Sequence, residues 1–163
     1  MNLSQLNSME LSKFVAVLGG VFENTPAIAQ QAWEQRPFVN VEALHRCMVE
    51  VMNRMNADEQ DTLMRSHPDL GSKVSMAEAS VKEQSRVGLD QLTSEEYQQF
   101  QQLNCLYQER FGFPFIVAVK NHTKASILEA FQTRLENSLE AERSQALAEI
   151  VQIARFRLDE MLG

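Results

Sequence analysis

Residues 41–55 read VEALHRCMVEVMNRM, and the apolar positions in this stretch decide the fold class. They recur three or four residues apart, which is the spacing of one face of an α-helix. Asn40 stands just before the stretch, where an asparagine side chain accepts a hydrogen bond from a free N–H group of the first turn. The stretch therefore predicts an amphipathic helix that begins after Asn40. Its apolar stripe consists of Val41, Leu44, Met48, Val51, Met52 and Met55.

Helical spacing continues on both sides of this stretch. Upstream, a first helix is predicted from Ser8 to Leu18, followed by two glycines that stop it. A second helix is predicted to be capped by Thr25, with Pro26 at its first position, and to end before Pro37. Downstream, helices are predicted over about residues 56–66, after capping boxes that begin at Ser80 and Thr93, and over about residues 124–137 and 139–162.

One segment, Phe113 to Val119, is a continuous apolar run with β-branched residues. Pro114 inside it argues against a central strand, and one strand cannot form a sheet. The predicted fold class is therefore all-α, a bundle of about seven to nine helices. No repeat or linker divides the 163 residues, so a single domain over 1–163 is expected.

The composition excludes several classes of protein. Apolar residues make up 44% and charged residues 23%, as in ordinary globular proteins. A net charge of −7 and the lack of a basic cluster argue against binding to nucleic acid, whose phosphates would be repelled. The two cysteines, Cys47 and Cys105, have no second ligand at metal spacing, so neither a zinc site nor a disulfide framework is expected.

No apolar stretch approaches the roughly 18 residues that a membrane span needs. The first residues also lack the basic and apolar regions of a signal peptide. We therefore expect a cytoplasmic protein that does not bind a membrane.

Three histidines are candidates for acid–base chemistry, because the pKa of an imidazole lies near neutrality. His45 lies beside Leu44 and Met48 and is best explained as a packing residue. His122 lies at a predicted helix start and is best explained as a solvated turn residue. His67 differs from both because of the residues that follow it.

His67 begins the sequence His67-Pro68-Asp69-Leu70-Gly71. Proline restricts the preceding residue to extended backbone, and glycine permits a sharp turn. Such a loop holds an imidazole in a fixed place. A purely structural turn, in which Asp69 caps the next segment, explains the five residues about equally well.

Glu83 and Gln84 place a carboxylate beside an amide early in a predicted helix. They form the second candidate site. The simpler interpretation is that Ser80 and Glu83 form a capping box without any function.

The third candidate is Arg157, in the last predicted helix. At about 100° per residue, Arg157 lies roughly 60° from the centre of the apolar stripe and Arg155 roughly 100° from it on the other side. An arginine at the edge of an apolar face either extends to solvent or presents its guanidinium to a buried anion.

Five motifs occur in order through most of the chain. Together they resemble the 2-oxo-4-hydroxy-4-carboxy-5-ureidoimidazoline (OHCU) decarboxylase family, in its bacterial form. The motifs are Phe22-Glu23-Asn24-Thr25-Pro26, Ser66-His67-Pro68-Asp69-Leu70-Gly71, Ser80-x-x-Glu83-Gln84 leading to Gly88-Leu89, Phe111-Gly112-Phe113-Pro114-Phe115-Ile116 and Ile153-Ala154-x-x-Arg157-Leu158.

The resemblance implies an all-helical enzyme of urate degradation that needs no cofactor and no metal and makes (S)-allantoin from OHCU. It also implies that His67, Glu83 and Arg157 are catalytic. It leaves a homodimer open. The positions that match substrate-contacting residues of the family are Pro68, Ser80, Gln84, Phe115, Ile116, Val117, Ala118 and Val119.

The chemistry is consistent with these residue types. The C=N system of the substrate ring can absorb the electron pair left by CO2, so no cofactor is needed as an electron sink. Protonation on one face needs one fixed acid, a task that His67 and Glu83 could share. Arg157 would bind an anionic or carbonyl oxygen through paired N–H groups.

A second hypothesis comes from another class of protein, the J-domain co-chaperones, which carry His-Pro-Asp between two helices. Such a module would bind a chaperone ATPase through a basic helix before the tripeptide. Here that helix includes Asp58, Glu59 and Asp61 and is acidic. The hypothesis also leaves Glu83 and Arg157 unexplained.

Overall fold

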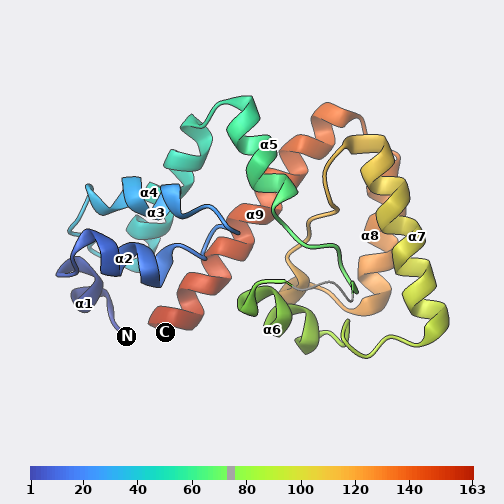
Figure 1. Ribbon diagram of the computed structural model, residues 1–163, viewed down its shortest axis with the longest axis horizontal. Helices are drawn as coiled ribbons and strands as arrows, with labels where there is room; N and C mark the ends of the chain where they lie inside the picture. The colour runs from blue at the N-terminus through green and yellow to red at the C-terminus, as the bar shows by residue number, and fades with distance from the viewer. Residues whose placement is uncertain (73–75) are drawn as a thin grey trace. The chain divides into compact units, whose positions relative to one another are not determined.

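The computed structural model describes residues 1–72 and 76–163, and all regular secondary structure within these ranges is helical (Figure 1). It forms nine α-helices and one short 3-10 helix there, with no strand, which confirms the all-α prediction. Residues 73–75 of the predicted loop lie outside the described residues. The elements are α1 Leu3–Asn7, α2 Leu11–Leu18, α3 Pro26–Trp33, α4 Val41–Arg54, α5 Ala57–Arg65, α6 Glu78–Arg86, α7 Ser94–Phe111, η1 Val119–Asn121, α8 Lys124–Leu135 and α9 Leu139–Leu162.

The helices belong to two compact units. The first combines Met1–Ser66 with Val151–Gly163, and the second consists of His67–Ile150. Helix α9 contributes its first half to the second unit and its second half to the first. The single domain over 1–163 stays a prediction.

In the first unit, α3 packs against both α2 and α4. The stripe that predicted α4 supplies four buried residues, Leu44, Met48, Val51 and Met52, while Val41 and Met55 are half-buried. Burial of such side chains stabilises a helix far more than its intrinsic propensity does. Other large, fully buried side chains of this unit include Leu6, Phe14, Leu18, Phe22 and Ile28.

In the second unit, α7 packs against α8 (Figure 1). A cluster of aromatic rings lies where they meet. Tyr107 of α7 lies at its centre, with its ring 5.2 Å from that of Phe115 and 4.7 Å from that of Phe111. The rings of Phe115 and Phe131 are stacked with 3.8 Å between their centroids. Phe115 belongs to the apolar run that was predicted not to form a strand, and this prediction is confirmed. The run is instead irregular and buried.

Most of the predicted helix ends are confirmed. Asn40 accepts a hydrogen bond from the Ala43 N–H, Thr93 begins a capping box with Glu96, and Gly112 ends α7 in the left-handed conformation. Pro26 is the first residue of α3, but the Thr25 side chain makes no capping hydrogen bond.

The capping box predicted at Ser80 and Glu83 is wrong. Helix α6 begins at Glu78, with Ala77 before it and no side-chain cap. Ser80 is therefore inside the helix, and its side chain is buried. Ser80 and Glu83 therefore do not form the capping box that the sequence predicted for them.

Among the helices of the described residues, none combines the length and the apolar character of a membrane span.

Candidate active site

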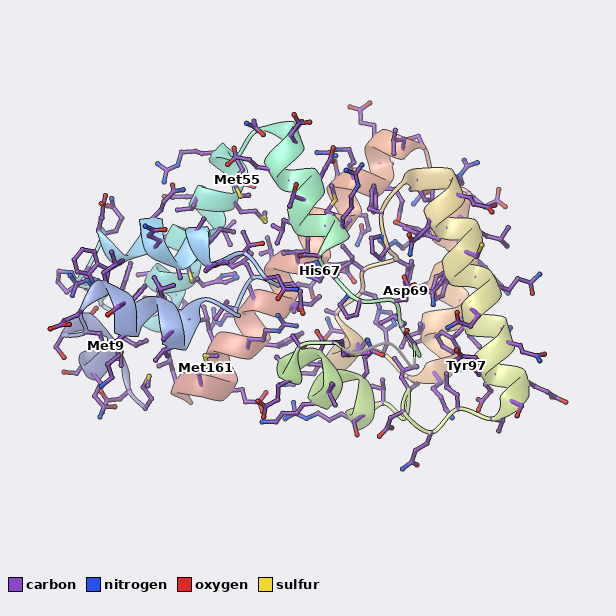
Figure 2. All side chains as sticks on the ribbon, viewed as in Figure 1. Met9, Met55, His67, Asp69, Tyr97 and Met161 are labelled. Carbon is purple, nitrogen blue, oxygen red and sulfur yellow. The ribbon has the colours of Figure 1, made fainter. Side chains whose placement is uncertain are left out.

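His67 lies where the chain leaves α5, and its side chain is only 7% exposed. Figure 2 shows Asp69 further along the same loop, beside α7. Gly71 has φ of +69°, so the sharp turn expected from the sequence is confirmed. The loop thus combines a buried imidazole, a proline that restricts its backbone, and a turn that only glycine adopts without strain.

Three amide side chains hold this loop in place. The Gln84 side-chain oxygen accepts a hydrogen bond from the Gly71 N–H at 3.0 Å, and the Asn104 amide donates to the Leu70 carbonyl at 2.9 Å. The Gln108 amide donates to the Asp69 carboxylate at 2.8 Å. Helices α6 and α7 therefore position the loop that begins with His67.

Sequence reasoning missed Asn104 and Gln108. Asn104 had a recognisable signal in the sequence, since it is a polar residue four positions after Phe100 on the apolar face of α7. In the structure Asn104 is 2% exposed. Most buried polar side chains form at least one hydrogen bond, so the position of Asn104 on this face indicated a structural contact.

Helix α6 carries three of the predicted site residues. Ser80 and Gln84 are buried, and Glu83 is half-buried. Because Gln84 bonds the His67 loop and α6 packs against η1, the second unit brings together the loop, the helix of Glu83 and the end of the Phe115–Val119 segment. Pro68 lies in the same loop and is half-buried.

The segment from Phe115 to Val119 is buried at every residue. Two side chains bind its backbone: Arg134 donates to the Ile116 carbonyl at 2.7 Å, and Glu149 accepts from the Ala118 N–H at 3.3 Å. An irregular buried segment needs such partners, because it has no regular backbone ladder.

Arg134 is itself part of a buried cluster of charged and polar groups. Its Nε donates to the Glu142 carboxylate, which also accepts a hydrogen bond from the Tyr107 hydroxyl at 2.6 Å. Glu142 is 0% exposed, and the Arg134 guanidinium lies 4.3 Å from the centre of the Phe115 ring. Burial, and then the hydrogen bond to Glu142, raise the pKa of Tyr107, which keeps its hydroxyl protonated as a donor.

Arg157 belongs to the first unit and is 6% exposed. Its guanidinium donates to the Glu23 carboxylate at 2.9 Å and to the Gly20 carbonyl at 3.0 Å. Arg155 is more exposed and pairs with Glu42 and Asp159. The prediction that Arg157 is the more inward arginine is confirmed. Its side chain was expected either to extend to solvent or to bind a buried anion, and the structure shows the second arrangement, with Glu23 as the anion.

The other two histidines have structural partners. The His45 ring lies 2.9 Å from the Val151 carbonyl, and the His122 ring lies 2.8 Å from the Ser126 hydroxyl. These contacts agree with the packing and turn roles predicted for them.

The first unit contains a cavity of about 340 Å³, which is lined in part by Phe38, Arg46, Cys47 and Arg54. It contains none of the predicted site residues. Burial raises the pKa of the Cys47 thiol, so this cysteine is not an activated nucleophile. Within the described ranges no three His, Cys, Asp or Glu side chains are grouped so that they could hold a metal ion.

The turn at Gly71 leads to a prediction about stability. Replacing Gly71 with alanine is expected to lower the free energy of unfolding by about 1–2 kcal/mol, because an L-residue is strained in the left-handed region. The new Cβ would also lie 2.7 Å from a methyl group of Leu92, which must move. Urea unfolding measures the change.

Gly112→Ala is the matched control. Gly112 has φ of +81°, but an added Cβ would meet nothing within 4 Å. Gly71→Ala should therefore cost somewhat more than Gly112→Ala. An equal or larger cost at Gly112 contradicts the proposed contact with Leu92.

Comparison with known proteins gives a consistent result. A family model described as OHCU decarboxylase matches residues 7–159. The OHCU decarboxylase of Haloferax volcanii is 38% identical over 160 residues, covering 98% of this chain and 95% of that protein. The crystal structure of an (S)-allantoin synthase matches with a TM-score of 0.81 and 26% identity, over 99% of this chain and 54% of the other.

Some relatives are much longer. The uric acid degradation bifunctional protein of Bacillus sp. (strain TB-90) is 41% identical over 161 residues, which cover 99% of this chain but 32% of that protein. The chain thus spans about a third of the length of the bifunctional relatives that it matches.

Proposed function

Because the chain belongs to the OHCU decarboxylase family, we propose that it removes the carboxyl group of OHCU and forms (S)-allantoin in urate degradation. The observation that carries this proposal is the similarity over nearly the whole of both proteins to a relative named as an OHCU decarboxylase. The geometry of the second unit supports it, since a buried histidine, a half-buried glutamate and a buried irregular segment are gathered there.

The reaction balances without a cofactor. The bond between the ring carbon and the carboxylate breaks and CO2 leaves. The electron pair of that bond stays on the ring and is taken up by the adjacent C=N group. The hydroxyl proton is lost as the carbonyl forms. The ring nitrogen and the carbon that bears the ureido group each gain a proton, so one proton is taken up for each CO2 released. Which face of that carbon receives its proton decides the enantiomer.

In this proposal His67 and Glu83 share the proton transfers. His67 accepts or relays the proton of the substrate hydroxyl, because an imidazole is both donor and acceptor near neutral pH. Glu83 is the partner in the second transfer. The fixed loop of His67 suits this task, because a proton delivered to one face must come from one place.

Arg157 binds an anionic or carbonyl oxygen of the substrate, and backbone N–H groups near Ile116 bind its ring or ureido oxygens. Pro68, Ser80 and the other backbone positions from Phe115 to Val119 line the substrate. Gln84 has an additional role, since its amide already holds the His67 loop.

We further propose that the protein acts in the cytoplasm. A homodimer stays a prediction.

The proposal predicts that the protein accelerates the formation of one enantiomer of allantoin. OHCU is generated in situ from urate, and circular dichroism follows allantoin with and without the protein. The expected result is a rapid signal of (S)-allantoin. A rate no higher than the spontaneous decay, with a racemic product, would overturn the proposed function.

A further inference from the structure

The motif from Phe22 to Pro26 has no part in the roles described so far, yet it contains a deeply buried charge. Glu23 is 1% exposed, and its carboxylate lies 2.9 Å from Nη2 of Arg157. Both residues belong to the first unit. Burying two charges loses much of their hydration, and an apolar pair of similar volume is often at least as stable. Stability alone is therefore a poor explanation for this pair.

The surroundings of Arg157 fix the orientation of its guanidinium. The Glu23 carboxylate binds Nη2, and the Gly20 carbonyl binds Nη1 at 3.0 Å. Two acceptors on different terminal nitrogens restrict rotation of the planar group. An arginine side chain otherwise has many rotamers, and a ligand that binds it must first order it.

The backbone of Glu23 is equally constrained. Its carbonyl accepts hydrogen bonds from the hydroxyls of Thr25 and Ser66, both at 2.8 Å. This contact explains why Thr25 does not cap α3. Asn24 has φ of +46°, a conformation that costs energy in a non-glycine residue and that often occurs at functional sites.

We propose that Glu23 is a positioning residue, which orients Arg157 for the substrate through its carboxylate and holds Ser66, the residue before His67, through its carbonyl. The inference rests on the proposed function, because it assumes that Arg157 binds OHCU. It assigns a role to a residue that contacts no substrate itself.

The test is Glu23→Gln, which keeps the length and the acceptor oxygen of the side chain and removes its charge. KM for OHCU is expected to rise about tenfold or more, with a smaller change in kcat, because the loosened guanidinium must be ordered when substrate binds. If Glu23 only repelled an anionic substrate electrostatically, the Glu23→Gln variant would instead have a lower KM than the wild type. A lower or unchanged KM in the folded variant therefore overturns the proposal.

A double-mutant cycle separates positioning from a general loss of structure. In an Arg157→Lys background, Glu23→Gln should change kcat/KM less than about twofold, since its partner is already altered. Additive losses in the cycle would contradict action through Arg157. The control is Arg155→Gln on the same helix, which breaks the exposed pairs with Glu42 and Asp159 and should leave KM unchanged.

Glu23→Asp replaces Glu23→Gln if the latter does not fold, as judged by far-UV circular dichroism. It keeps the charge but shortens the reach by one methylene group, and the same rise in KM is expected. The wild type is measured in parallel. An inactive wild type overturns the proposed function together with this inference, whereas an active wild type and a Glu23→Asp variant with normal KM overturn the inference alone.

Discussion

Replacing His67 with asparagine is expected to lower kcat for OHCU decarboxylation by about 10²- to 10⁴-fold, the range typical of a positioned acid–base group. Asparagine can still form hydrogen bonds but cannot carry a proton in the reaction. KM should change much less than kcat, because the residue acts mainly in the transition state. The measurement is the initial rate of (S)-allantoin formation at several OHCU concentrations.

The chain supplies two controls for this experiment. His45 and His122 have contacts with Val151 and Ser126 and no proposed part in the reaction. Their asparagine variants should retain near-normal kcat. If His67→Asn is as active as these controls, His67 is not an acid–base residue.

Glu83→Gln tests whether the glutamate shares the proton transfers. Its kcat should fall by a similar factor, because glutamine cannot transfer a proton in the reaction. Glutamine has nearly the same helix propensity as glutamate, so α6 should stay folded. The double variant with His67→Asn should lose little more than the single ones, since groups that act as a unit are not additive.

The second large effect is on stability. Replacing Arg134 with methionine is expected to lower the free energy of unfolding by about 3–5 kcal/mol, because Glu142 would remain buried without its cation. Glu142 is 0% exposed, and the Ile116 carbonyl would also lose its donor. At about 2–4 °C per kcal/mol for a chain of this size, Tm should fall by about 6–20 °C. Urea and thermal unfolding measure both quantities.

Two further variants show whether the lost cation is the cause. Arg134→Met combined with Glu142→Leu removes both charges and should recover part of the stability, because no uncompensated charge remains. Arg155→Met breaks only exposed ion pairs and should have a far smaller effect than Arg134→Met. A double variant less stable than Arg134→Met alone would contradict the explanation.

Local chemistry made most of the fold predictable. The helix ends at Asn40, Asn56, Thr93 and Gly112 depend on residues within one turn, so sequence patterns identify them. The five-residue helix α1 was missed, because it buries only Leu6 and shows no apolar stripe. The start of α6 was misplaced because burial of Ser80 and Gln84, rather than a cap, determines where that helix lies.

Partners distant in the chain could not be predicted. The position of Arg157 on its helix indicated an inward side chain, but nothing in the sequence pairs it with Glu23. The same holds for Arg134 and Glu142, which no local pattern of the sequence pairs and which the structure buries. Periodicity indicates which face of a helix is buried, whereas the identity of a buried ion pair depends on how the helices pack.

The pairing of Glu23 with Arg157 has a consequence for folding during synthesis on the ribosome. The two residues are 134 positions apart in the chain. At roughly 5–20 residues per second, a ribosome needs about 7–27 s to proceed from one to the other. During this time Glu23 has no Arg157 to bind, while residues 67–150 are synthesised as one continuous stretch. The order of synthesis therefore allows the His67 loop and α6 to fold before the arginine is made.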